Sequence, residues 1–188
     1  MDLRMVCYDV MESGFETGYL EFVKDAQVIT QMHKDFGFWS GPFSKHSIMD
    51  YFMAKVAPCE LFTVAKTQKE IERRLADYHE NFIRSFAGQC VATYALGIRD
   101  RHPGNFMMQN KTGKFFHIDF GHFLGHAKKK LGIVRDREPF IYSDELHYFL
   151  RHFSDIKVMG TNPKPGTELN KDDSQLQKGE SALLRADS

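Results

Sequence analysis

Apolar residues recur at steps of three and four between residues 66 and 96, and this spacing predicts one long amphipathic helix. The repeating positions are Ile71, Leu75, Tyr78, Phe82, Phe86 and Cys90. A stripe of this kind faces a hydrophobic core. We expect the helix to stop near Gly97, so that the residues after it form a loop.

Shorter patterns on either side of this helix predict strands and small helices. Residues 3–8 and 18–23 are rich in apolar and aromatic residues and predict two strands joined by a turn at Gly14. Residues 115–119 predict a buried strand after a turn at 111–114. Polar caps at Asp25 and Ser143 predict two short helices, and a third short helix is predicted to start at Ser47. Residues 36–43 predict a loop, and the polar residues from 154 onward predict a disordered tail.

The composition narrows the class of protein without naming a function. The 188 residues are 42% hydrophobic and 27% charged, and 25 basic residues balance 25 acidic ones. The overall charge therefore indicates no nucleic-acid partner. The three cysteines lack metal-ligand spacing, and no signal peptide or membrane-spanning run is present. We expect a soluble intracellular protein.

Three polar residues have the spacing of a phosphoryl-transfer site. Asn105 follows Asp100 by five positions, and Asp119 begins an Asp-Phe-Gly triplet. Protein kinases use this spacing: one Asp orients the acceptor hydroxyl, and the Asn and the second Asp hold Mg²⁺. Either Asp alone would more simply cap a turn or end a strand. Their combination argues against that explanation.

The order of residues around these positions resembles one kinase superfamily. Asp100-Arg101-His102 followed by Asn105, and then His117-Ile118-Asp119-Phe120-Gly121-His122, are similar to motifs of the phosphoinositide 3-kinases and related kinases. The similarity covers residues 2 to about 150. It implies an α+β, protein-kinase-like two-lobed fold, present here mainly as the helical C-lobe. The implied divisions are strands and hinge of the N-lobe at 1–24, the C-lobe at 25–153 and a polar tail at 154–188.

The resemblance also implies roles for individual residues, with ATP and Mg²⁺ as cofactors. Asp100, His102 and His122 would be catalytic, and Asn105 and Asp119 would bind the metal. Glu21 and Val23 would belong to the hinge that binds adenine, and Tyr8, Met107 and Ile118 would line its pocket. For these apolar residues a simple core role is nearly as good an explanation. We interpret His117 as a structural strand residue.

A basic segment follows the second motif and bears on the substrate. Residues 128–137 include Lys128, Lys129, Lys130, Arg135 and Arg137 against one acidic residue, a local net charge of +4. Such a run is usually a solvated surface, but here it follows Asp-Phe-Gly, where kinases meet the acceptor. Lys and Arg bind phosphate strongly. The resemblance to class I members therefore favours phosphatidylinositol 4,5-bisphosphate, phosphorylated on its 3-hydroxyl.

Other functions stay open at this point. A class II 3-kinase, a 4-kinase or a protein kinase of the superfamily is one alternative, and a non-catalytic lipid- or partner-binding fragment is another. Arg99 stands where the family usually has Gly, Pro103-Gly104 is typical of the protein-kinase branch, and Glu138 replaces an apolar residue. The phosphate-binding loop and strand lysine of the smaller lobe are missing, so we expect a fragment with little ATP turnover of its own.

The resemblance further implies where the protein acts. We expect a cytoplasmic protein that is recruited peripherally to phosphoinositides at the plasma membrane through the basic segment, with salt weakening the contact. A regulatory subunit is possible through regions that this chain does not contain.

Overall fold

The computed structural model describes residues 2–36, 46–62, 65, 67–124, 129–130, 133–134, 140–153 and 156, with only the backbone for 60–62, 129–130 and 133–134. All of them belong to one compact unit, residues 1–158. Helices and a small antiparallel sheet make up this α+β unit. The predictions for residues 37–45 and for the tail after 156 lie outside the described residues, and the domain boundaries stay predictions.

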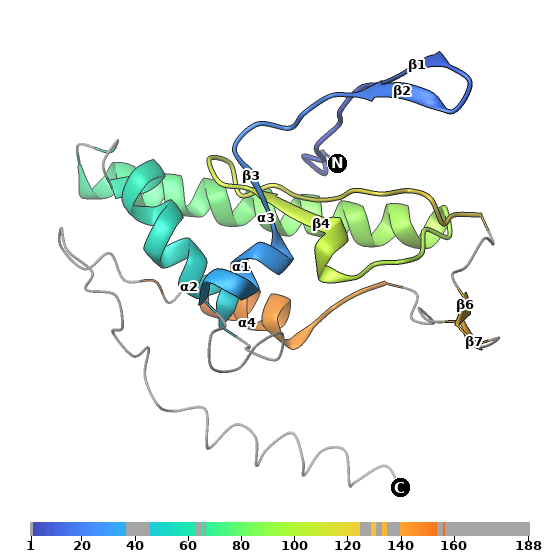
Figure 1. Cartoon of the computed structure of the whole chain (residues 1–188). Helices are drawn as coiled ribbons and strands as arrows, with labels where there is room; N and C mark the ends of the chain where they lie inside the picture. Colours follow the sequence, from blue (N-terminus) through green and yellow to red (C-terminus); the bar gives the residue numbers. More distant parts are fainter. Residues whose placement is uncertain are drawn as a thin grey trace, which may run out of the picture. The chain divides into compact units, whose positions relative to one another are not determined.

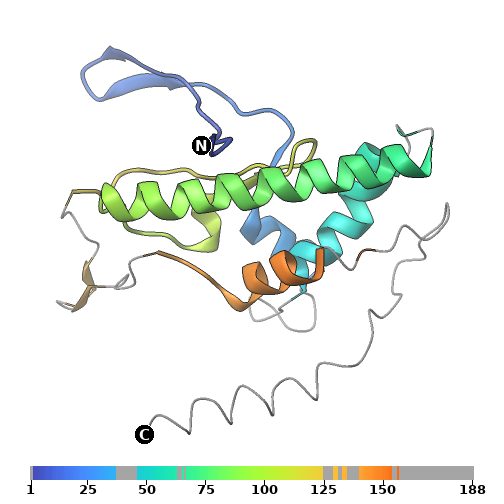
Figure 2. The same cartoon turned by 180° about the vertical axis from the view of Figure 1, so that it is seen from behind.

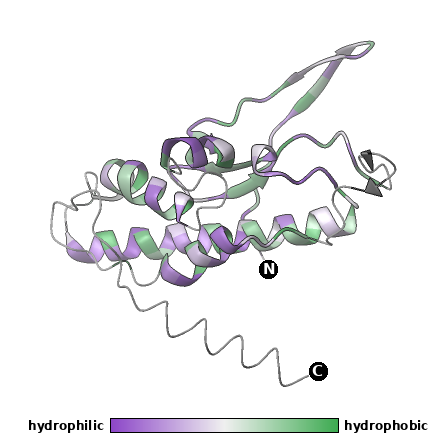
Figure 3. Ribbon diagram, turned by 60° about the horizontal axis from the view of Figure 1, so that its bottom comes forward, coloured by the Kyte–Doolittle hydropathy of each residue, from purple (hydrophilic) through white to green (hydrophobic). Residues whose placement is uncertain are grey.

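The long predicted helix is confirmed as α3, Gln68–Ala95. Its first turn is capped by Thr67, whose side chain accepts a hydrogen bond from the Glu70 amide at 3.2 Å. Hydrophilic and hydrophobic positions alternate around α3 (Figure 3), as expected for a helix with one buried face. The helix ends before Gly97, which takes a positive φ of 58° that a glycine adopts easily.

A three-stranded antiparallel sheet contacts α3. Its order is β3 (Ala26–Val28), β4 (Phe106–Gln109) and β5 (Phe115–His117). The predicted strand at 115–119 is thus confirmed for its first three residues. The Phe115 amide donates a 2.8 Å hydrogen bond to the Ser85 hydroxyl of α3, which fixes the strand on the helix.

Gly113, in the turn between β4 and β5, gives a first testable prediction. It has a φ of 75°, and a Cβ there would lie 2.7 Å from the Tyr78 ring and 2.8 Å from its carbonyl oxygen. We expect Gly113→Ala to lower the free energy of unfolding by roughly 2–4 kcal/mol through backbone strain and overpacking. Chemical denaturation measures this. Gly14→Ala, whose Cβ would meet only the Thr17 hydroxyl, is the control, and equal losses in both variants would contradict the explanation.

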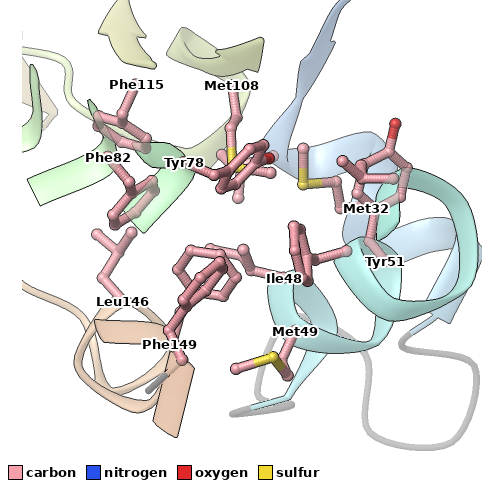
Figure 4. Packing of buried hydrophobic residues seen from close by; sticks show 14 of the residues in the cluster. Met32, Ile48, Met49, Tyr51, Tyr78, Phe82, Met108, Phe115, Leu146 and Phe149 are labelled. Atoms are coloured by element: carbon pink, nitrogen blue, oxygen red, sulfur yellow. The ribbon is translucent and has the colours of Figure 1, made fainter. Parts of the chain in front are cut away.

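The remaining helices close the hydrophobic core. They are α1 (Ile29–Phe36), α2 (Ser47–Tyr51), which continues into the π-helix η2 (Phe52–Phe62), and α4 (Asp144–His152). In both views α1, α2 and α4 lie together on one side of α3 (Figures 1 and 2). Aromatic rings fill the centre (Figure 4): Phe52 contacts Tyr78 at 4.9 Å and Phe82 contacts Phe149 at 4.8 Å between ring centroids.

A buried ion pair joins three of these helices. Glu145 of α4 lies 2.6 Å from His33 of α1, and its other oxygen accepts from the Ile48 amide of α2 at 3.1 Å. Both side chains of the pair are about nine-tenths buried. Burial raises the pKa of Glu145, and the hydrogen bond from His33 acts in the opposite direction.

The helix starts predicted at Ser47 and Ser143 are confirmed. Ser47 is the first residue of α2, and the Ser143 hydroxyl accepts from the Leu146 amide at 3.3 Å at the start of α4. The prediction at Asp25 is wrong, because the next residues form strand β3 beside β4. Asp25 instead has a φ of 55° and pairs with Lys111 at 2.8 Å.

The strand predicted at residues 3–8 is also wrong. Its apolar residues pack on α3: Met5 fills the space beside Gly88, where a Cβ would lie 2.8 Å away, and Arg4 donates to Asn81 at 2.8 Å. The hairpin lies later, as β1 (Val10–Gly14) and β2 (Thr17–Leu20). The strand predicted at 18–23 thus overlaps β2 but ends at Leu20.

Within the described part, no helix has the length and apolar character needed to cross a membrane.

Candidate active site

The two sequence motifs meet through their main chains. The Arg99 amide donates to the His122 carbonyl at 2.7 Å, and the Leu124 amide donates to the Leu96 carbonyl at 3.0 Å. These bonds hold the segment after α3 against the Asp-Phe-Gly segment. The residues predicted as catalytic and metal-binding therefore belong to one local structure.

Asn105 holds the loop of residues 100–105 through hydrogen bonds of its side chain and main chain. Its side-chain Nδ2 donates to the Asp100 carbonyl at 2.8 Å, and its own amide donates to the His102 carbonyl at 2.8 Å. The Ile118 amide in turn donates to the Asn105 carbonyl at 2.8 Å. Because Nδ2 is used in this way, the oxygen Oδ1 is the atom of the side chain that is suited to a metal.

Both motif aspartates have left-handed backbones. Asp100 has a φ of 62° and Asp119 a φ of 66°. Such conformations are uncommon outside glycine, though Asp tolerates them better than most residues. The turn into the loop thus falls on Asp100, and Arg99 needs no positive φ. The family's usual glycine at position 99 is therefore not required by the backbone here.

His102 begins a short 3-10 helix, η3 (Pro103–Asn105). Its Nδ1 accepts from the Gly104 amide at 3.0 Å, which places the proton of the neutral ring on Nε2. A Cβ on Gly104 would lie 2.8 Å from this ring, and Pro103 occupies the first helical position, where proline is favoured. Pro103-Gly104 therefore has a local structural reason.

His117 is the residue that the sequence interpretation placed outside the chemistry. Its side chain is 1% exposed, and its pKa is lowered to about 4 because burial disfavours the charged ring. The charges of Asp119, Arg101, His102 and Asp100 also act on it. It lies in a strand, as expected, but at a point that several motif residues surround.

Asn105 and Asp119 have side-chain oxygens that are suited to binding Mg²⁺. The amide and carboxylate oxygens match the hard oxygen ligands that Mg²⁺ prefers, and nucleotide phosphates and water commonly complete its shell. Asp119 is exposed, and its Oδ1 accepts from the Gly121 amide at 3.2 Å. Among the described residues, no three His, Cys, Asp or Glu side chains form a metal-binding group by themselves.

Two of the five residues predicted for the adenine pocket line one hollow of the described part of the chain, and the adenine site stays a prediction. A hollow of about 430 Å³ includes Glu21 and Val23 in its lining, but not Tyr8, Met107 or Ile118. The hydroxyl of Tyr8 donates to the His117 carbonyl at 3.4 Å. Met107 and Ile118 are half-buried in and beside the sheet. The Glu21 amide donates a hydrogen bond to the Asp9 carbonyl at 2.8 Å.

The basic segment is described only in part. Lys129–Lys130 form strand β6, which pairs with β7, Ile133–Val134. Lys128, Arg135 and Arg137 lie outside the described residues. Their predicted role in substrate binding stays a prediction.

Comparison with known proteins identifies the family. The family model described as phosphatidylinositol 3- and 4-kinase matches residues 1–162. The chain belongs to this kinase family. The phosphatidylinositol 3-kinase C2 domain-containing subunit gamma of Mus musculus is 36% identical over 163 residues, which are 83% of this chain and 10% of that protein.

Two further relatives show the same pattern. The phosphatidylinositol 4-phosphate 3-kinase C2 domain-containing subunit beta of Homo sapiens is 38% identical over 150 residues, 80% of the chain and 8% of the relative. Phosphatidylinositol 3-kinase 2 of Dictyostelium discoideum is 38% identical over 148 residues, which are 77% of this chain and 7% of that protein. The chain thus spans a tenth or less of the length of these phosphatidylinositol 3-kinases.

Proposed function

We propose that this chain carries the catalytic loop and the metal-binding segment of a phosphatidylinositol 3-kinase, which transfers the γ-phosphate of ATP to the 3-hydroxyl of an inositol lipid. The main-chain bonds between residues 96–99 and 122–124 carry the proposal, because they join the two motifs that phosphoryl transfer needs. A kinase of this kind acts mainly by positioning its reactants and neutralising charge.

The residues of the loop have distinct tasks in this proposal. Asp100 orients the acceptor hydroxyl and takes its proton. His102 has its proton on Nε2, so it is suited to donating a hydrogen bond to a phosphate oxygen rather than to acting as a base. His122 contributes a half-buried imidazole on the same segment. Asn105 and Asp119 would hold Mg²⁺, which would neutralise the negative charge of the ATP phosphates.

The candidate lipid substrates belong to two classes. The net charge of +4 between residues 128 and 137 supports phosphatidylinositol 4,5-bisphosphate, the class I substrate. The names of the relatives favour the class II alternative, because they refer to phosphatidylinositol and its 4-phosphate. A membrane-bound substrate fits peripheral recruitment of a cytoplasmic protein through the same basic segment.

A lipid panel separates these candidates. Residues 1–162 replace the matching segment of the human subunit beta, and the graft is assayed with labelled ATP on vesicles of each lipid. If the bisphosphate is the substrate, we expect replacement of Lys128, Lys129 and Lys130 by alanine to reduce its use at least tenfold, as lost charge-assisted bonds predict, and to spare phosphatidylinositol.

Two outcomes decide against parts of the proposal. Undiminished use of the bisphosphate after the triple substitution removes the basic segment as the substrate determinant. A graft that binds vesicles and nucleotide but phosphorylates none of the lipids supports the non-catalytic alternative. The matched control replaces Lys69 of α3, an exposed lysine away from the motifs.

A further inference from the structure

The ring of His117 has an environment that packing alone does not explain. It lies between the rings of Phe106 and Phe120, at centroid distances of 4.9 and 5.3 Å. Among the described residues, neither ring nitrogen has a hydrogen-bond partner, although both are fully buried. Leaving such groups unpaired costs stability, so a phenylalanine would be the more stable choice at this place.

The proposed metal ligand Asp119 follows His117 closely in the chain. His117 and Asp119 are two residues apart, and while burial lowers the pKa of the ring, the charge of the Asp119 carboxylate acts in the opposite direction. In the described structure, one carboxylate oxygen of Asp119 accepts a hydrogen bond from the Gly121 amide. Metal-binding carboxylates are commonly oriented by a hydrogen bond from a second residue. A neutral imidazole offers one N–H donor for this purpose.

We propose that His117 is a positioning residue for Asp119, and that its buried N–H donates to the Asp119 carboxylate when Mg²⁺ and nucleotide bind. This inference rests on the proposed function, and it adds to it a residue that does not itself touch the substrate. The ring nitrogens are then unpaired in the absence of ligands, and the hydrogen bond forms when Mg²⁺ and nucleotide are bound. At functional sites a residue is often not the one that would be most stable at its position, and His117 fits this pattern.

The first test compares stability with binding in the 188-residue chain. We expect His117→Phe to raise the melting temperature by about 2–6 °C, since it removes unpaired polar atoms. The same variant should bind Mg²⁺ with a non-hydrolysable ATP analogue about tenfold more weakly. His117→Asn and His117→Gln place an amide near one or the other ring nitrogen, and one of them should recover the affinity.

A second histidine provides the matched control. His79 of α3 is stacked on Phe153 at 4.7 Å, and its Nε2 lies 3.2 Å from the Leu150 carbonyl. Because this ring already has its partner, His79→Phe should lower the melting temperature and leave the affinity for the analogue unchanged. If His117→Phe also melts at a lower temperature than the unsubstituted chain, His117 is a structural residue and the inference is overturned.

Nuclear magnetic resonance of the histidine rings tests the hydrogen bond itself. On addition of Mg²⁺ and the analogue we expect the main-chain amide signals of Asp119 and Gly121 to move together with one ring nitrogen of His117, while His79 stays unchanged. Movement of the amides without the ring overturns the inference and leaves the proposed function standing. If no signal moves at saturating analogue, both are contradicted.

Discussion

Replacing Asp119 by asparagine is expected to lower the turnover number of the grafted kinase roughly a thousandfold, because a metal ligand that neutralises transferring phosphate is worth several kcal/mol. The side chain is exposed and its one described hydrogen bond, from the Gly121 amide, can be kept by an amide oxygen. The melting temperature should therefore change little. Initial rates at saturating ATP and lipid, with calorimetry on the same samples, measure both quantities.

The effect should depend on position and on the metal. Asp77→Asn removes an exposed carboxylate of α3, which pairs at the surface with Arg73 at 3.6 Å, and should leave the rate unchanged. Raising the Mg²⁺ concentration should recover part of the loss in Asp119→Asn and nothing in the control. A turnover number within tenfold of the unsubstituted graft would remove Asp119 from the metal site.

Replacing Glu145 by alanine is expected to have the largest effect on stability, about 3–5 kcal/mol of unfolding free energy, as for other broken buried ion pairs. The substitution leaves His33 without its 2.6 Å partner and the Ile48 amide without its acceptor. Three helices lose their common contact at once. Urea denaturation followed by circular dichroism provides the measurement.

A double variant distinguishes lost pairing from lost volume. His33→Phe with Glu145→Leu replaces both buried polar side chains by apolar ones of similar size, which commonly restores stability. We expect it to recover most of the loss, except the part due to the Ile48 amide. If the double variant is as unstable as Glu145→Ala, the ion pair is not the cause.

The parts of the fold that the sequence predicted well are those that local chemistry determines. The stripe of α3 follows from periodicity, and the cap at Ser143 follows from a hydrogen bond to the helix's own backbone. The predictions at residues 3–8 and at Asp25 failed for the opposite reason. An apolar run can pack on a helix as well as pair in a sheet, and only tertiary contacts decide between them.

The site shows the same division. The spacing of Asp100, Asn105 and Asp119 was visible in the sequence because a motif fixes residue types at fixed distances. The hydrogen bonds between residues 96 and 124 and between residues 99 and 122 join main-chain atoms. They therefore require no particular side chain, and the sequence gives no sign of them. His117 was undervalued because its burial between Phe106 and Phe120 is a property of the folded chain. A histidine in an otherwise apolar strand was the available signal.

The central claim is that this chain supplies the acceptor and metal side of a 3-kinase. The most direct measurement is the position of labelled phosphate on the inositol ring, determined by chromatography of the deacylated lipid after reaction of the graft. We expect label on the 3-hydroxyl, and we expect it to be lost in the Asp119→Asn variant. Label on the 4-hydroxyl, or label that persists on the 3-hydroxyl in that variant, would contradict it.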